Sequence, residues 1–161
     1  MAATAALAQS VAFGPMTDLD HRVDLLQHLW LFSSCADDEL SRIAGLFTTA
    51  EVAGDTELFA QGDDGDDFYV IVDGTAEATV DGDTVAELDA GSFFGEMALV
   101  DGGERTATVT ATSPMSLLVL SRNDFNTMLS TAMPHVAPKL LQIMGQRIRE
   151  LAQHAGNPLP Y

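Results

Sequence analysis

Hydrophobic residues recur along this chain with two different periods, helical at both ends and alternating in the middle. At the start, residues 18–32 and 36–47 place apolar side chains three or four positions apart, which predicts two short amphipathic helices. Beyond the centre of the chain the helical spacing returns, with Asn123 or Asp124 as a capping residue, and Pro134 separates two further helices. Helices therefore flank a central region of different structure.

The central region, residues 54–103, predicts β-structure. It contains nine glycines and no proline, and short apolar or alternating segments lie between the glycines. Asp81 and Gly82 form the dipeptide of a two-residue hairpin turn. Short strands punctuated by glycine are typical of a small barrel or roll. We expect strands at residues 68–73, 75–80, 84–88, 106–112 and 115–120.

Length and composition are those of one globular domain. The chain has 161 residues, 47% of them hydrophobic, and its single cysteine, Cys35, excludes an internal disulfide and fits a reducing, cytoplasmic location. No segment approaches the ~18 consecutive apolar residues of a membrane span, so we expect no membrane association. The expected organisation is a flexible arm at 1–17, one domain at 18–155 and a short tail at 156–161.

The charge of the chain is strongly negative. With 24 acidic and 7 basic residues and a net charge of −17, the surface repels phosphate backbones, which argues against nucleic acid as a partner. Between Ile43 and Ser121, sixteen acidic residues accompany a single cation, Arg105. Two interpretations of this cation are open: a surface pair with Glu104, or a binding site for an anion.

The residues before Arg105 favour the anion site. Gly95 lets a ligand approach the backbone, and residues 96–100 have the length of one helical turn whose free amides would face an anion. Arg105 follows a Gly-Gly loop, and its guanidinium is permanently charged. Glu96 can only accept hydrogen bonds, so the ligand needs a hydroxyl or amine near its anionic group. A ribose phosphate satisfies both residues.

The segment FGEMALVDGGERTATVTA, residues 94–111, resembles the phosphate-binding cassette of the cyclic nucleotide-binding domain family. The glycine-rich run at 53–80 is similar to the family's first strands, and the resemblance covers most of the chain. It implies a mainly β fold, an eight-stranded β-roll (jelly roll) with N-terminal helices and two C-terminal helices. It also implies a non-enzymatic receptor without a cofactor or metal, whose ligand is cAMP or, as the second option, cGMP.

The resemblance implies a role for each residue of the cassette. The family's glutamate accepts the ribose 2′-hydroxyl, a role that falls on Glu96, and its arginine binds the cyclic phosphate, a role that falls on Arg105. Thr106 matches a hydroxyl that in some members contacts the phosphate or a syn guanine; the alternative is an outward-facing strand threonine. The backbone amides of the phosphate cradle correspond to Gly95, Met97, Ala98 and Ala107.

The last helix is expected to cover the base and to carry the output. Arg147, Leu151 and Gln153 are candidates for the base cap, and Arg147 is equally well explained as a solvated partner of Glu150. An apolar stripe with coiled-coil spacing either pairs with a second copy or packs on the roll: Ala137, Leu141, Met144, Ile148 and Leu151. Because no helix-turn-helix domain follows, we expect a stand-alone receptor that relays occupancy, by helix rearrangement, to an unknown effector protein or within a homodimer.

Other functions find less support in the sequence. The four histidines all lie outside the predicted roll, which removes a cupin-type metal site. The acidic turn at 63–67 lacks the acidic twelfth residue of a calcium loop, and Cys35 has no catalytic motif around it. The remaining alternative is an interaction module on the same fold that no longer binds nucleotide. That change usually removes the arginine or the glutamate, and both are present here.

Overall fold

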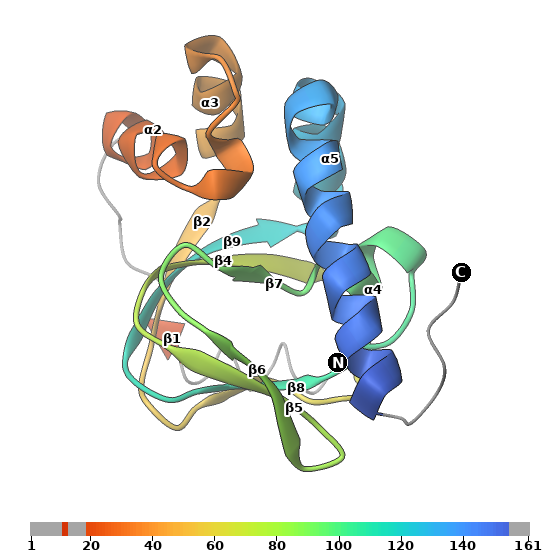
Figure 1. Ribbon diagram of the computed structural model, residues 1–161. Helices are drawn as coiled ribbons and strands as arrows, with labels where there is room; N and C mark the ends of the chain where they lie inside the picture. The colour runs from red at the N-terminus through yellow and green to blue at the C-terminus, as the bar shows by residue number, and fades with distance from the viewer. Residues whose placement is uncertain (1–10, 13–18, 155–161) are drawn as a thin grey trace.

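Helices flank a β-roll in the computed structural model, which describes residues 11–12 and 19–154 (Figure 1). Before the roll come α2 (Leu19–Gln27), the 3₁₀ turn η1 (Trp30–Phe32) and α3 (Asp37–Ala44). The short helix α4 (Glu96–Asp101) interrupts the strands, and α5 (Arg122–His154) follows them. The strands are β1 (Val11–Ala12), β2 (Thr48–Val52), β3 (Glu57–Phe59), β4 (Asp67–Asp73), β5 (Ala76–Val80), β6 (Asp83–Leu88), β7 (Phe93–Phe94), β8 (Thr108–Ala111) and β9 (Met115–Ser121).

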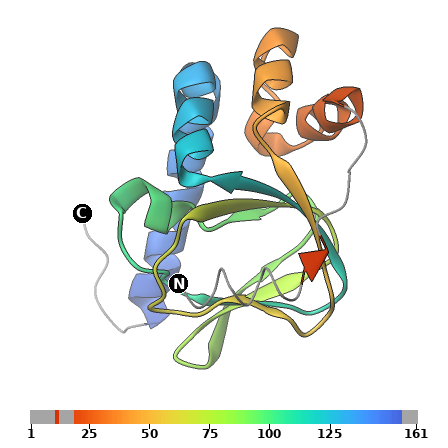
Figure 2. The same cartoon turned by 180° about the vertical axis from the view of Figure 1, so that it is seen from behind.

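Two antiparallel sheets form the walls of the roll (Figure 2). Their strand orders are β1-β2-β9-β4-β7 and β3-β8-β5-β6, so β2 to β9 make up the expected eight-stranded roll. The predicted hairpin turn joins β5 to β6, with Asp81 at φ 53° and Gly82 at φ 87°. Two successive residues with positive φ suit a type I′ turn, whose twist matches that of the strands.

The expected flexible arm is in part a strand. Val11 and Ala12 pair antiparallel with Val52 and Glu51 of β2, so the edge strand β2 gains backbone partners there. Main-chain pairing of this kind satisfies amide and carbonyl groups that an edge strand otherwise leaves to water. Residues 1–10 and 13–18, and the tail beyond residue 154, lie outside the described residues.

The hydrophobic core has two parts, separated by the sheet that contains β4 and β9. Alternate residues of β9 face opposite sides: Leu117 lies inside the roll, and Leu118 faces the helices. Phe68 of β4 is fully buried on the helical side, where it contacts Phe125 of α5 at a ring-centroid distance of 5.1 Å. These strands are therefore apolar on both faces, which explains their continuous rather than alternating hydrophobic pattern.

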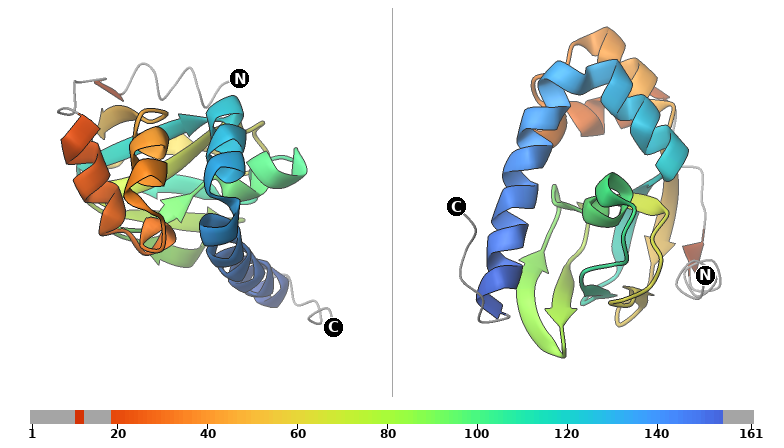
Figure 3. Two further views of the ribbon diagram at one scale, coloured as in Figure 1. Left: turned by 90° about the horizontal axis from the view of Figure 1, so that it is seen from above. Right: turned by 90° about the vertical axis from the view of Figure 1, so that its right-hand side faces the viewer.

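Helix α5 is bent, and its second half runs past the open side of the roll (Figure 3). The Ser121 hydroxyl caps its start by accepting a hydrogen bond from the Asp124 amide, so the predicted capping residues are wrong by two or three positions. Ala132 has non-helical torsions, φ −127° and ψ 27°, directly before the Met133-Pro134 step. Proline removes a helical hydrogen bond and crowds the preceding turn, which accounts for the bend.

The apolar stripe of α5 is divided between core and solvent. Leu140, one position from the predicted stripe, is buried with Val136, whereas Leu141 is 65% exposed and Ile148 is 43% exposed. Met144 is half-buried against the core. Packing on the roll thus explains only part of the stripe. Among the described helices none is long and apolar enough to cross a bilayer.

Candidate functional site

A pocket lies between the β3-β8-β5-β6 sheet, α4 and the second half of α5. About 590 Å³ of empty space lies between these elements, a volume that includes the open mouth of the pocket. The structure brings nine of the ten residues proposed for the ligand site and its cap to the pocket lining: Gly95, Glu96, Met97, Ala98, Arg105, Thr106, Ala107, Arg147 and Leu151. Gln153, the third candidate for the cap, is exposed and does not line it.

Gly95 forms the corner between β7 and α4. Its φ of 91° is left-handed, and a Cβ there would lie 2.8 Å from both Arg105 Nη1 and the Asp67 carbonyl oxygen. Both the torsion and the close approach therefore require glycine. The corner directs the first turn of α4 at the pocket, as the sequence predicts.

Arg105 is held rigidly although it follows a loop. Its Nη1 donates to the Gly95 carbonyl and its Nη2 to the Asp67 carbonyl, both at 2.9 Å. The guanidinium carbon lies 4.1 Å from the centre of the Phe59 ring, and only 5% of the residue is exposed. A surface pair with Glu104 is therefore not the role of this cation: the side chain is aimed inward and anchored by main-chain oxygens.

Burial gives Arg105 an unusual electrostatic environment. Desolvation lowers the pKa of its guanidinium from the usual value, while neighbouring Tyr69, Asp67, Asp66 and Glu96 act in the opposite direction. Arginine remains protonated at neutral pH even so. A positive charge removed from water attracts an anion more strongly than an exposed one, because the local dielectric is lower.

Glu96 opens α4 and is completely buried. Its Oε1 accepts a hydrogen bond from Arg147 Nη1, and the same guanidinium donates through Nη2 to the Phe93 carbonyl. Arg147 also lies over the Phe93 ring, at 5.2 Å from its centre. This arginine is therefore a partner of Glu96 and not a solvated partner of Glu150, and its role as a base cap stays a prediction.

Two buried polar atoms of the pocket have no partner. Among the described residues, three buried side-chain nitrogen or oxygen atoms lack a hydrogen bond, and two of these are Glu96 Oε2 and Arg105 Nε. Leaving such an atom unpaired costs about 1–3 kcal/mol, and more when it is charged. One atom accepts and the other donates, and both belong to residues that line the pocket.

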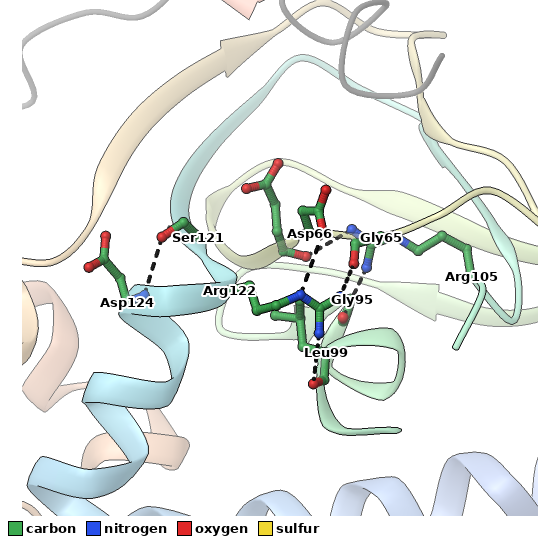
Figure 4. Close-up of polar contacts among 9 residues, drawn as sticks. Gly65, Asp66, Gly95, Leu99, Arg105, Ser121, Arg122 and Asp124 are labelled. Carbon is green, nitrogen blue, oxygen red and sulfur yellow. Dashed lines mark hydrogen bonds and ion pairs between the residues drawn. The ribbon is translucent and has the colours of Figure 1, made fainter. Parts of the chain in front are cut away.

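A third arginine, Arg122, connects the pocket to the start of α5 (Figure 4). It donates to the Gly65 carbonyl at 2.6 Å and to the Leu99 carbonyl at 3.2 Å, and it pairs with Asp66 at 3.5 Å. Gly65 in turn lies against Arg105, where an added Cβ would be 2.3 Å from Nε. The chain of contacts runs from the buried guanidinium through a loop and α4 to the C-terminal helix.

Sequence analysis missed four residues of this arrangement. Asp67 contributes only a carbonyl oxygen and Gly65 only its small size, properties that no residue pattern reveals. Arg122 lies between a predicted strand and the predicted capping residues of a helix, and Glu150, expected only as a partner of Arg147, lines the pocket itself. Thr106 lines the pocket although it is exposed; it lies just before β8, and its hydroxyl has a weak contact of 3.8 Å with the sulfur of Met97.

The structure also describes the residues of the other sites considered from the sequence: a metal site, a calcium-binding turn and a catalytic cysteine. Within the described residues no three His, Cys, Asp or Glu side chains are grouped so that they could hold a metal ion. In the acidic turn, Asp63 caps the Ala60 amide and Asp66 pairs with Arg122, so part of its charge has a structural use. Burial raises the pKa of the Cys35 thiol, which is the opposite of what a nucleophile needs.

Comparison with known proteins gives the class of this fold and pocket. The sequence profile of the cyclic nucleotide-binding domain matches residues 50–132, which span the roll, the cassette and the start of α5. The match covers more than half of the chain. The chain therefore belongs to the cyclic nucleotide-binding domain family, a family of regulatory domains.

Three named proteins are similar to this chain in sequence or in structure. A cAMP-dependent protein kinase regulatory subunit of Yarrowia lipolytica is 32% identical over 113 residues, which is 69% of this chain and 30% of the relative's length. The catabolite activator protein of Thermus thermophilus is 30% identical, with a TM-score of 0.67 over 78% of this chain and 61% of that one. The regulatory subunit of a cAMP-independent protein kinase A from Trypanosoma brucei, 18% identical, shares the fold with a TM-score of 0.71 over 80% of this chain and 46% of that one.

Proposed function

We propose that this chain is a receptor that binds cAMP, and cGMP in the same orientation, and passes occupancy on through α5. In this proposal Arg105 binds the cyclic phosphate, Glu96 accepts the ribose 2′-hydroxyl, and the base lies between the roll and the second half of α5. The proposal includes no catalytic step and no cofactor. It goes beyond family membership, because the cAMP-independent relative has the same fold.

The two unpartnered atoms of the pocket are the main support. Arg105 Nε needs an acceptor and Glu96 Oε2 needs a donor, and both atoms are buried. In a cyclic nucleotide the phosphate oxygens and the 2′-hydroxyl belong to adjoining parts of one fused ring system and supply these groups together. Inorganic phosphate lacks a sugar hydroxyl, and a free sugar lacks an anionic oxygen to pair with the guanidinium.

Glu96 can bind the ligand without releasing Arg147. A carboxylate has two oxygens, and Arg147 occupies Oε1 only. A 2′-hydroxyl at Oε2 would therefore strengthen a chain of contacts from the sugar through Glu96 to Arg147 and α5. This is the route by which occupancy would reach the helix, since the free energy available for a shift is the difference in affinity between the two helix positions.

The output partner is proposed from the surface of α5. Leu141 and Ile148 are exposed apolar residues seven positions apart, so they lie on one face of the helix. An effector protein or a second copy of this chain would bind there. Molar mass measured by light scattering, with and without nucleotide, distinguishes a homodimer from a monomer that acts on another protein.

Calorimetry with chemically paired ligands tests the binding proposal. Wild type is titrated with cAMP, cGMP and 2′-deoxy-cAMP, and the titrations are repeated with Glu96→Ala, Arg105→Ala and the surface control Arg149→Ala. Removing the 2′-hydroxyl should weaken binding to wild type by about 5- to 150-fold, the equivalent of ~1–3 kcal/mol for an unsatisfied buried acceptor. Glu96→Ala should make cAMP and its 2′-deoxy form nearly equal.

The same titrations also show which results would contradict the proposal. Arg105→Ala should lose at least ~30-fold in affinity while its circular dichroism stays that of wild type, and Arg149→Ala should bind normally. Absence of binding by wild type to every cyclic nucleotide would reduce this chain to an interaction module. A wild type that binds cAMP and 2′-deoxy-cAMP equally would contradict the role of Glu96.

A further inference from the structure

Away from the pocket, a histidine and a carboxylate connect α5 to the N-terminal helices. His135 Nδ1 lies 2.9 Å from Oε1 and 3.1 Å from Oε2 of Glu39. Glu39 belongs to α3, and His135 is the first residue of α5 after the Met133-Pro134 step. The pair therefore joins residues 96 positions apart, just beyond the bend from which α5 runs toward the open side of the roll (Figure 3).

Neighbouring contacts hold this pair in place. Glu39 also accepts a hydrogen bond from the Ala36 amide at 3.0 Å, which fixes its carboxylate at the start of α3. One turn beyond His135, Lys139 donates to the Trp30 carbonyl at 2.6 Å. The exposed fraction is 15% for the Glu39 side chain and 40% for the His135 side chain. Partial burial reduces the screening of the pair by salt.

The charge of the imidazole determines the strength of this contact. An ionised carboxylate can only accept hydrogen bonds, so Nδ1 carries a hydrogen whether the ring of His135 is neutral or protonated. A second proton, at Nε2, makes the ring positive and turns the hydrogen bond to Glu39 into an ion pair. Imidazole side chains ordinarily titrate near pH 6.5, so this change falls within the physiological range.

The other titratable groups around the pair keep their charge in that range. Hydrogen bonding to a main-chain amide and to His135 lowers the pKa of Glu39, which therefore stays ionised. Burial raises the pKa of the Cys35 thiol, which stays neutral. The remaining charged groups near the pair are Asp38 on α3 and Lys139 on α5, and carboxylates and ammonium groups ordinarily titrate well outside pH 6 to 8. The 3₁₀ turn η1, which also packs against α5, consists of apolar residues.

The same helical segment carries contacts of the pocket. Arg147, which pairs with Glu96, follows His135 by 12 residues, or about 18 Å along the helix. Ala132 is the residue at which the torsions of α5 are non-helical, so the helix is continuous between these two contacts. A contact that fixes one end of a continuous helix restricts the movement of the other end. Both contacts are made in the same position of α5.

Resting on the proposed function for its effect on the ligand, we propose that Glu39 and His135 form a pH-sensitive latch. It is tighter when the imidazole is protonated, and it then favours the position of α5 in which Arg147 reaches Glu96. Nucleotide affinity should therefore rise as pH falls from 8 to 6. A partly exposed pair of this kind changes an equilibrium constant by about 2- to 5-fold. In stronger acid, below the lowered pKa of Glu39, the carboxylate is protonated and the ion pair is lost.

Glutamine at position 135 tests the latch, because His135→Gln keeps a neutral hydrogen-bond donor and removes the titration. Dissociation constants for cAMP and cGMP are measured by calorimetry at pH 6 and pH 8 for wild type, His135→Gln and His28→Gln. His28, an exposed histidine after α2 whose Nδ1 contacts the Asp24 carbonyl at 2.7 Å, is the matched control. Hydrogen exchange of residues 135–147 is measured without nucleotide at the same pH values, with rates corrected for the intrinsic effect of pH.

We expect wild type to bind cAMP and cGMP about 2- to 5-fold more tightly at pH 6 than at pH 8, and residues 135–147 to be more protected at pH 6 by a similar factor. His135→Gln should lose both differences, and His28→Gln should keep them. Equal affinity of wild type at the two pH values overturns the inference, and so does a pH dependence that survives in His135→Gln. In both cases nucleotide still binds, so the proposed function stands. If wild type binds neither nucleotide, the proposed function fails, and so does the effect of the latch on affinity.

Discussion

Gly65 provides a sharp test of how the phosphate site is assembled, because its role depends on space alone. A Cβ added there would lie 2.3 Å from Nε and 2.5 Å from Cζ of Arg105. Ordinary contacts begin at 3.4 Å, so Gly65→Ala forces the guanidinium or the loop to move by about 1 Å. The two hydrogen bonds of Arg105, both 2.9 Å long, tolerate little movement of this size.

The expected cost follows from those bonds. A hydrogen bond to a charged group contributes about 1.5–3 kcal/mol, so the loss of one should lower the free energy of unfolding by about that amount. Affinity for cAMP and cGMP should fall at least ~30-fold, since the guanidinium would leave the position that its two main-chain hydrogen bonds fix. Urea unfolding measures the first quantity, and calorimetry measures the second.

Gly145→Ala is the matched control. Gly145 lies in α5, is exposed, and has nothing within 4 Å of the position of an added Cβ. Alanine is favoured over glycine in a helix by about 0.8–1.0 kcal/mol, so this variant should gain stability and bind nucleotide as wild type does. If Gly65→Ala binds both nucleotides within twofold of wild type, the idea that close packing at Gly65 holds Arg105 in place is wrong.

Three further predictions concern α5, acid and salt. Arg147→Ala should weaken nucleotide binding by about 10- to 100-fold and speed hydrogen exchange in the second half of α5, while Arg149→Ala should do neither; equal behaviour of the two variants would rule out the anchoring role. The Ala36 amide and His135 lower the pKa of Glu39, so its ionised form stabilises the fold above its unfolded pKa near 4.5, and this contribution is lost as pH falls through the lower folded value. Urea midpoints at several acidic pH values should therefore fall less steeply for Glu39→Gln, and identical slopes would contradict this account. In stopped-flow mixing, association with an anionic nucleotide should become faster as salt rises modestly, because the net charge of −17 repels the ligand at long range; a steep decrease would mean that the local field of the pocket dominates.

The sequence predicted those parts of the site that depend on residue type. A cation isolated among carboxylates and a glutamate after a left-handed glycine are chemical signals, and the structure places Arg105 and Glu96 in one pocket. The period of the apolar residues likewise located the helices and most strands. The short strands β3 and β7, of three and two residues, lack the length for a period to appear.

Other parts of the structure depend on contacts between residues far apart in the chain, and they leave no signal in the sequence. The pairing of Arg147 with Glu96 joins residues 51 positions apart, and sequence spacing suggested only the nearby Glu150 as a partner. Ser121 caps α5 because β9 ends there, a boundary that the sequence fixes only within a few residues. The strand at Val11 and Ala12 depends on the free edge of β2 and not on its own composition.

Burial divides α5 into two parts, and the boundary lies near Leu140, beyond the bend at Ala132. Before the bend, Phe125 and Met128 are fully inaccessible to solvent; beyond Leu140, none of the described side chains whose burial is defined is fully buried. The distal segment can therefore detach at a small fraction of the global unfolding free energy while the proximal segment stays docked. If the chain acts as proposed, a distal segment that detaches while the proximal segment stays docked would let the domain respond to a ligand many times without unfolding.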